Sequence, residues 1–124
     1  MLYLAYERLK RNYHGTQREL DAAISEKQSK IGTRAAGKQR LEARIEELKG
    51  ILAERADLLK AKEAELKASK DVYDRIYRMR YIDREKVRAI ARRVGYSEPQ
   101  TYRLLKEIQT NVNRVNDDTG GGEG

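Results

Sequence analysis

A seven-residue pattern of mainly apolar side chains runs through the first seventy residues, and this repeat constrains the fold more than any other feature of the chain. It follows two stretches: Leu2, Tyr6, Leu9, Tyr13, Thr16, Leu20, Ala23 and Lys27, and then Leu41, Ile45, Leu48, Leu52, Arg55, Leu59, Lys62 and Leu66. A repeat of this kind places most of the apolar side chains along one stripe of a helix. We therefore expect two long helices, over about residues 2–31 and 38–81.

The glycine-bracketed sequence GTRAAG, residues 32–37, separates the two predicted helices. Short connections favour antiparallel neighbours. Folding the chain back at Arg34 places Leu20 opposite Leu48 and Ala23 opposite Ile45. The sequence thus predicts a coiled-coil-like antiparallel hairpin over residues 1–70, and the alternative is that each helix pairs with another chain.

A two-helix hairpin buries little apolar surface, so self-association is expected. Ile51 and Leu58 lie beside the seam and extend its apolar stripe. We expect a homo-oligomer assembled through this region, with a dimer favoured.

The sequence VRAIARRVGYSEPQTYRLLK, residues 87–106, matches a helix-turn-helix. Ala91 provides the small side chain that lets the first helix approach its partner. Gly95 stands where the turn needs a positive φ, which glycine adopts without Cβ strain. Ser97 and Gln100 form an S-x-x-Q capping box, and Pro99 fits the first turn, where the backbone has no intrahelical acceptor. The predicted module covers residues 71–115.

Charge favours DNA as the partner of this module. From residue 83 to 106 the chain has seven basic residues against three acidic ones, and the whole chain carries a net charge of +7. A helix-turn-helix buried against protein does not need such an excess of positive charge, whereas one that binds DNA phosphates does. A helix-turn-helix that only supports another all-α protein is the competing interpretation.

Candidate DNA contacts follow from how a helix-turn-helix docks, with the start of its second helix in the major groove. The candidates for reading bases are Ser97, Glu98, Tyr102 and Arg103. Arg103 is the strongest of these, because its guanidinium matches O6 and N7 of guanine. The candidates for binding phosphate are Arg84, Arg88, Arg92, Arg93 and Lys106.

Catalytic or metal-binding chemistry finds no support in the sequence. There is no cysteine, and the single histidine, His14, has no second ligand near it in the chain. We expect no enzyme activity and no cofactor. No run of eighteen apolar residues is present and the first residues do not form a signal peptide, so we expect no membrane association and a location in the cytoplasm.

Five side chains follow the hairpin at three- and four-residue spacing and are expected to form a core stripe against the helix-turn-helix: Val72, Tyr73, Ile76, Tyr77 and Met79. Residues 116–124, NDDTGGGEG, are acidic and rich in glycine, and we expect them to be a disordered tail. The predicted fold is all-α: a long antiparallel hairpin followed by a small helix-turn-helix module.

The segment from Tyr73 to Ile108 resembles the C-terminal module of phage late transcription regulators of the ArpU and RinA type, which carry a helix-turn-helix like that of sigma-factor region four. The matching features are Arg80–Tyr81, the IA…VGYS core (Ile90, Ala91, Val94 to Ser97) and Tyr102–Arg103. The family usually has valine or isoleucine in place of Thr101, and often arginine or lysine in place of Pro99.

The resemblance implies a sequence-specific DNA-binding regulator of transcription in a phage or prophage. We expect such a regulator to act in the cytoplasm of a bacterial host and to contact host RNA polymerase. Two alternatives stay open. A small terminase subunit couples a similar module to an oligomerising hairpin and recognises DNA packaging sites. A coiled-coil adaptor would use its basic end to bind another protein and would not bind DNA.

Overall fold

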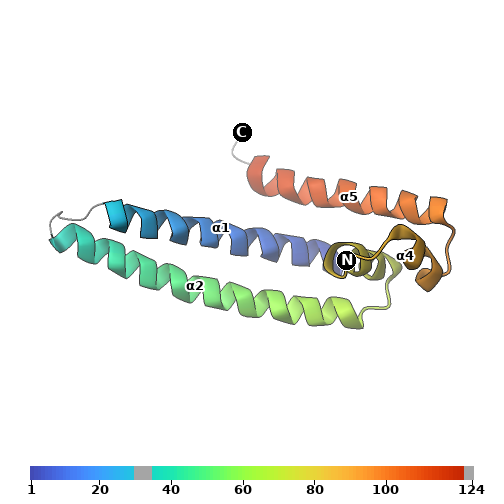
Figure 1. Cartoon of the computed structure of the whole chain (residues 1–124), viewed down its shortest axis with the longest axis horizontal. Coiled ribbons are helices and arrows are strands. Elements are labelled where there is room, and N and C mark those ends of the chain that lie inside the picture. Colours follow the sequence, from blue (N-terminus) through green and yellow to red (C-terminus); the bar gives the residue numbers. More distant parts are fainter. Residues whose placement is uncertain (30–34, 122–124) are drawn as a thin grey trace. The chain divides into compact units, whose positions relative to one another are not determined.

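The computed structural model describes residues 1–29 and 35–121, with side chains for residues 1–29 and 37–117. Regular structure in these residues is entirely helical, which confirms the predicted all-α class. The elements are α1 (Leu2–Ser29), α2 (Ala35–Ala68), α3 (Val72–Tyr77), the π-helical segment η1 (Arg78–Ile82), α4 (Val87–Val94) and α5 (Glu98–Gly121) (Figure 1). None of the described helices is long and apolar enough to cross a membrane.

Helices α1 and α2 pack against each other as a hairpin, as the repeat predicts. Leu20 and Ala23 of α1 are buried in one cluster with Ile45 and Leu48 of α2. These are the residues that the fold-back at Arg34 places opposite each other. Residues 32–34 of the predicted break lie outside the described residues, and α2 already begins at Ala35.

The chain divides into two compact units that do not follow the predicted domain boundaries. The hairpin unit comprises Leu9–Leu59. The helix-turn-helix unit comprises Met1–Arg8 together with the chain from Lys60 onward. Residues from both ends of the sequence therefore build the second unit, whereas the sequence analysis places residues 1–8 and 60–70 in the hairpin.

The expected continuous helix over residues 38–81 is wrong, because α2 ends at Ala68 and α3 begins at Val72. Asp71 has an extended backbone (φ −64°, ψ 132°), and its side chain accepts a hydrogen bond from the N–H of Asp74. That is an N-cap, which satisfies a free N–H of a new helix and so starts α3. At the end of α2, the Ser69 N–H donates a hydrogen bond to the Leu66 carbonyl at 3.2 Å.

The core of the helix-turn-helix unit contains the predicted stripe. Ile76, Tyr77 and Met79 are almost fully buried, and Val72 and Tyr73 pack against them. The remaining buried members come from four other helices, α1, α2, α4 and α5: Tyr3, Leu66, Ile90, Ile108 and Val112. Each such side chain contributes about 1.5–3 kcal/mol when it is fully removed from water. This cluster fixes α4 and α5 on α3.

Helix α5 extends beyond the module predicted from the sequence. Val115 is still buried, so the helix packs on the core up to that residue. Residues 116–121, which we expect to be disordered, continue the same helix, and residues 122–124 lie outside the described residues.

Candidate nucleic-acid interface

The turn between α4 and α5 has the geometry that the sequence predicts. Gly95 adopts φ 76° and ψ 28°, the left-handed conformation in which a side chain would be strained. The N–H groups of Gly95 and Tyr96 both donate to the Ala91 carbonyl, at 2.9 and 3.0 Å. These bonds satisfy the end of α4 and direct the chain into the next helix.

The start of α5 carries the predicted capping box. The Gln100 N–H donates to Ser97 Oγ at 3.3 Å, and the Ser97 N–H donates to Gln100 Oε1 at 3.1 Å. Two backbone donors that the helix leaves free are thereby satisfied. Pro99, in the first turn, costs no hydrogen bond there.

Thr101 is fully buried beneath the motif, at the position where the resembled family has valine or isoleucine. Its hydroxyl donates to the Ser97 carbonyl at 2.9 Å. The polar group is therefore satisfied within the helix, and its methyl group remains available to the core that contains Ile90 and Ile108.

All four residues predicted to read bases are exposed at the start of α5. Tyr102, with 58% of its surface exposed, and Arg103 have no partner among the described residues. Ser97 is already engaged, because its hydroxyl takes part in the capping box and also bonds Gln100 Oε1 at 3.2 Å. Tyr102 and Arg103 are thus the side chains most available to a partner.

The five residues predicted to bind phosphate are exposed as well, on the approach to α4, on α4 itself and on α5. Arg93 differs from the others, because its guanidinium donates to Glu85 at 3.1 Å. The other four, Arg84, Arg88, Arg92 and Lys106, form no ion pair within the described part of the chain. Their charge is available to an external anion.

Arg84 has an unusual backbone, with φ 56° in the left-handed region. A non-glycine residue in this conformation is strained by about 1–2 kcal/mol. Arg84 lies between η1 and α4, where the Glu85 N–H donates to the Met79 carbonyl at 2.8 Å. The surrounding hydrogen bonds hold the arginine in this strained turn, directly before the first helix of the motif.

Tyr96 is a surface residue that the sequence analysis did not select. It is 39% exposed and lines two adjacent depressions. One of them is lined also by Arg88, Arg92 and Glu98, and the other by Gln100 and Arg103, among others. The signal in the sequence is its position directly after the turn glycine, in the connection between the two helices.

Three tyrosine hydroxyls hold α5 in place, and the sequence analysis missed them as a group. Tyr73 donates to Glu107 at 2.6 Å, Tyr81 donates to Gln109 at 2.6 Å, and Tyr3 accepts from Asn111 at 2.9 Å. At about 100° per residue, Gln109 lies on the opposite flank of the core stripe from Glu107 and Asn111. Hydrogen bonds on both flanks therefore fix the rotation of α5 about its axis.

A fourth tyrosine, Tyr77, lies between the rings of Tyr3 and Tyr81 in the core. It stacks on Tyr3 and Tyr81, with ring centroids 5.2 and 4.8 Å apart, and its hydroxyl donates to the buried carboxylate of Glu7. Burial, and then the hydrogen bond to Glu7, raises the pKa of Tyr77. Burial also raises the pKa of Tyr3 and Tyr81.

No group of three or more histidine, cysteine, aspartate or glutamate side chains is placed to hold a metal ion among the described residues. His14 lies in α1, where its ring contacts Tyr13 edge-on at 5.6 Å.

Comparison of the chain with protein-family models, with curated proteins and with solved structures found no match in any of the three. The resemblance described above is therefore carried by the quoted residues alone.

Proposed function

We propose that this chain is a sequence-specific double-stranded DNA-binding protein that acts as a transcription regulator of the phage or prophage type. The observation that carries the proposal is the surface at the start of α5. There a glycine turn, a capped helix and exposed Tyr102 and Arg103 adjoin exposed cations on α4.

Charge supports DNA over a protein partner. Four cations of this surface have no ion-pair partner among the described residues, so ion pairs within the fold do not neutralise them: Arg88, Arg92, Arg103 and Lys106. Charged residues other than arginine are depleted at the centre of protein interfaces, whereas lysine and arginine both serve as phosphate contacts. The arrangement of α4 and α5 also supports DNA binding, since the second helix of such a motif enters the major groove.

Assembly belongs to the same proposal. A single helix-turn-helix covers one half-site, and two joined modules bind far more tightly than either alone. We place the joining surface on α2 near Leu58, which is 53% exposed. The protein would act as a homodimer in the cytoplasm of a bacterial host, in contact with its RNA polymerase, without a catalytic role, cofactor or membrane.

Direct binding measurements test the proposal. Duplexes that the protein selects from a random library would be compared with unselected duplexes by fluorescence anisotropy at several salt concentrations. For a DNA-binding protein, the logarithm of the association constant falls linearly with the logarithm of the salt concentration. Arg103→Ala should cost about 1–3 kcal/mol on selected DNA and little on unselected DNA.

Arg18→Ala is the matched control, because Arg18 is an exposed arginine of the hairpin unit with no partner among the described residues. It should leave both affinities unchanged. Absence of any salt-sensitive affinity in the unmodified protein would refute DNA binding and favour the adaptor. A ring-forming stoichiometry in light scattering, in place of a dimer, would favour the terminase subunit.

A further inference from the structure

Helix α5 is longer than reading a major groove requires. It has 24 residues and so spans about 36 Å, and the side chains proposed to read bases occupy only its first turns. The rest of the helix is not a free extension, since Ile108, Val112 and Val115 hold it on the core. Its outer face is therefore presented in a fixed position.

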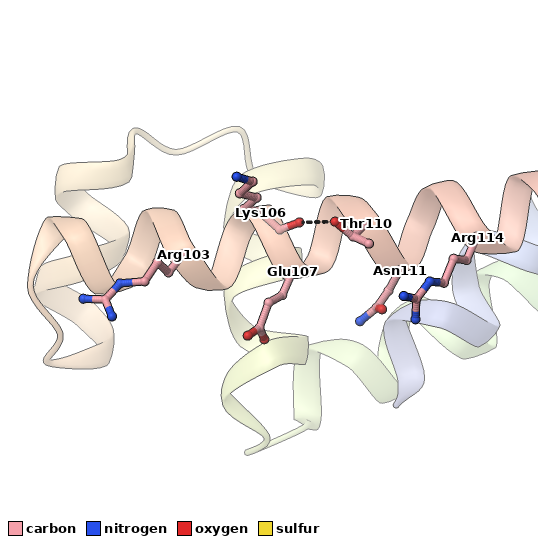
Figure 2. Close-up of a pocket in the computed structure, with 6 residues that line it drawn as sticks. All are labelled: Arg103, Lys106, Glu107, Thr110, Asn111 and Arg114. Carbon is pink, nitrogen blue, oxygen red and sulfur yellow. Dashed lines mark hydrogen bonds between the residues drawn. The ribbon is translucent and has the colours of Figure 1, made fainter.

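That outer face contains a groove with a positive lining. Figure 2 shows the residues that line it: Arg103, Lys106, Glu107, Thr110, Asn111 and Arg114. Three of the six are cations and one is an anion. The cations have no ion-pair partner among the described residues, whereas the Glu107 carboxylate already accepts the Tyr73 hydroxyl.

The uncharged polar lining is occupied within the fold. The Thr110 hydroxyl donates to the Lys106 carbonyl at 3.0 Å, the bond drawn in Figure 2, and the Asn111 amide donates to Tyr3 at 2.9 Å. The donors that remain for a ligand are the ammonium and guanidinium groups and the second N–H of the Asn111 amide. A groove of this kind attracts anionic oxygen without selecting a particular base or side chain.

This groove continues the surface proposed to read DNA. Arg103 lines both it and the depression beside Tyr96, so the two hollows share a wall. Arg103 and Arg114 are eleven residues apart, which corresponds to about 16 Å along the helix. A duplex presents one phosphate per about 3.4 Å of axis on each strand, so a flanking backbone has several phosphates within that reach.

We infer that the groove along the middle of α5, from Arg103 to Arg114, binds the phosphate backbone beside the bases that the helix reads, and that Arg114 is its outer contact. The inference rests on the proposed function. An acidic protein segment fits the groove less well, because none of the large exposed apolar side chains, which protein partners use as anchors, lies in it.

Arg114→Ala tests this inference in the full chain. Loss of one phosphate contact should weaken binding about fivefold at roughly 0.15 M salt, equally on selected and unselected DNA, and reduce the salt slope by about 0.9. Hydroxyl-radical footprinting should show protection lost at one edge of the site. Arg114→Lys, which keeps the charge, should restore most of the affinity, and Arg18→Ala should have no effect.

The outcomes separate the two proposals. If Arg103→Ala abolishes discrimination while Arg114→Ala leaves affinity and footprint unchanged, the groove does not bind DNA and its cations are left for an acidic partner. Loss of discrimination on Arg114→Ala would also overturn the inference, because Arg114 would then read a base. If the unmodified protein has no affinity for DNA, both proposals fail together.

Discussion

The backbone N–H of Tyr3 donates to Asp74 Oδ1 at 3.0 Å, so a side chain of α3 caps the first turn of α1 across 71 residues of chain. Asp74 is almost fully buried, and its second oxygen accepts the Ser69 hydroxyl at 2.8 Å. One carboxylate thus joins the start of α1, the end of α2 and the start of α3. The helix-turn-helix unit depends on this junction.

Asp74→Ala should therefore destabilise the protein. The variant leaves the Tyr3 N–H without its acceptor in a buried position, and such a loss costs about 1–3 kcal/mol. Urea unfolding followed by circular dichroism measures the change. Asp57→Ala, at an exposed aspartate of α2 with no partner in the described residues, is the control and should change the free energy of unfolding little. Equal effects of the two substitutions would contradict the capping role.

The tyrosine cluster predicts a loss of stability at alkaline pH. The pKa of Tyr77 is raised above its ordinary value of 10.0, first by burial and then by the bond to Glu7. In the unfolded chain this tyrosine loses its proton near pH 10, whereas in the folded protein it keeps it. The contribution of Tyr77 to the free energy of unfolding is thus complete below pH 10. It is lost as the pH rises further, at up to about 1.4 kcal/mol per pH unit.

Tyr77→Phe should lower stability at pH 7 by about 1.5–3 kcal/mol, the usual contribution of a hydrogen bond to a charged group. It should also make the decline above pH 10 shallower. Urea unfolding at a series of pH values checks both effects. Tyr102→Phe, at an exposed ring, serves as the control, and an equally steep decline in the two variants would count against the cluster.

Replacing glycine by alanine should change the free energy of unfolding in opposite directions at two positions. Gly95→Ala places a β-carbon at φ 76° and should lower the free energy of unfolding by about 1–2 kcal/mol. Gly50 lies inside α2, and a β-carbon added there would meet no atom within 4 Å, so Gly50→Ala should raise it by up to about 1 kcal/mol. Thermal unfolding of both variants measures the difference, and a loss of stability in both would show that α2 packs closely at Gly50.

Neighbouring arginines of α4 should contribute unequally to DNA affinity. Arg92 has no ion-pair partner among the described residues, whereas Arg93 is held by Glu85 at 3.1 Å. Arg92→Ala should weaken binding about fivefold near 0.15 M salt, the effect of one lost phosphate contact, and Arg93→Ala should weaken it less. Glu85→Gln should strengthen binding, because it frees the Arg93 charge. Anisotropy titrations would decide, and equal losses from both arginine variants would mean that DNA displaces Glu85.

The parts of the fold that the sequence predicted are those with a local signal. Gly95, Ser97 and Gln100 predicted the turn and the cap because each acts on backbone groups within a few residues. The break between α2 and α3 also had such a signal in Asp71, but the apolar spacing that continues from Val72 to Met79 favoured one long helix. The local N-cap outweighed that spacing.

Contacts between distant residues could not be predicted in the same way. The bonds from Tyr3 to Asn111 and from Tyr73 to Glu107 join side chains whose spacing in the chain carries no period. The predicted DNA-contact residues are all exposed, because outward positions on a helix follow from its geometry. Whether one of these arginines pairs with a nearby carboxylate does not follow from helix geometry, so the Arg93–Glu85 ion pair became visible only in the structure.

The helix-turn-helix unit is assembled from discontinuous chain, and this has a consequence for biosynthesis. Tyr3 is synthesised more than a hundred residues before Asn111 and Val112, which complete its surroundings. The hairpin unit, Leu9–Leu59, is available to fold while the rest is still being synthesised. The first turn of α1 therefore completes its contacts only after Val112 has been made, and the helix-turn-helix unit is completed later than the hairpin unit.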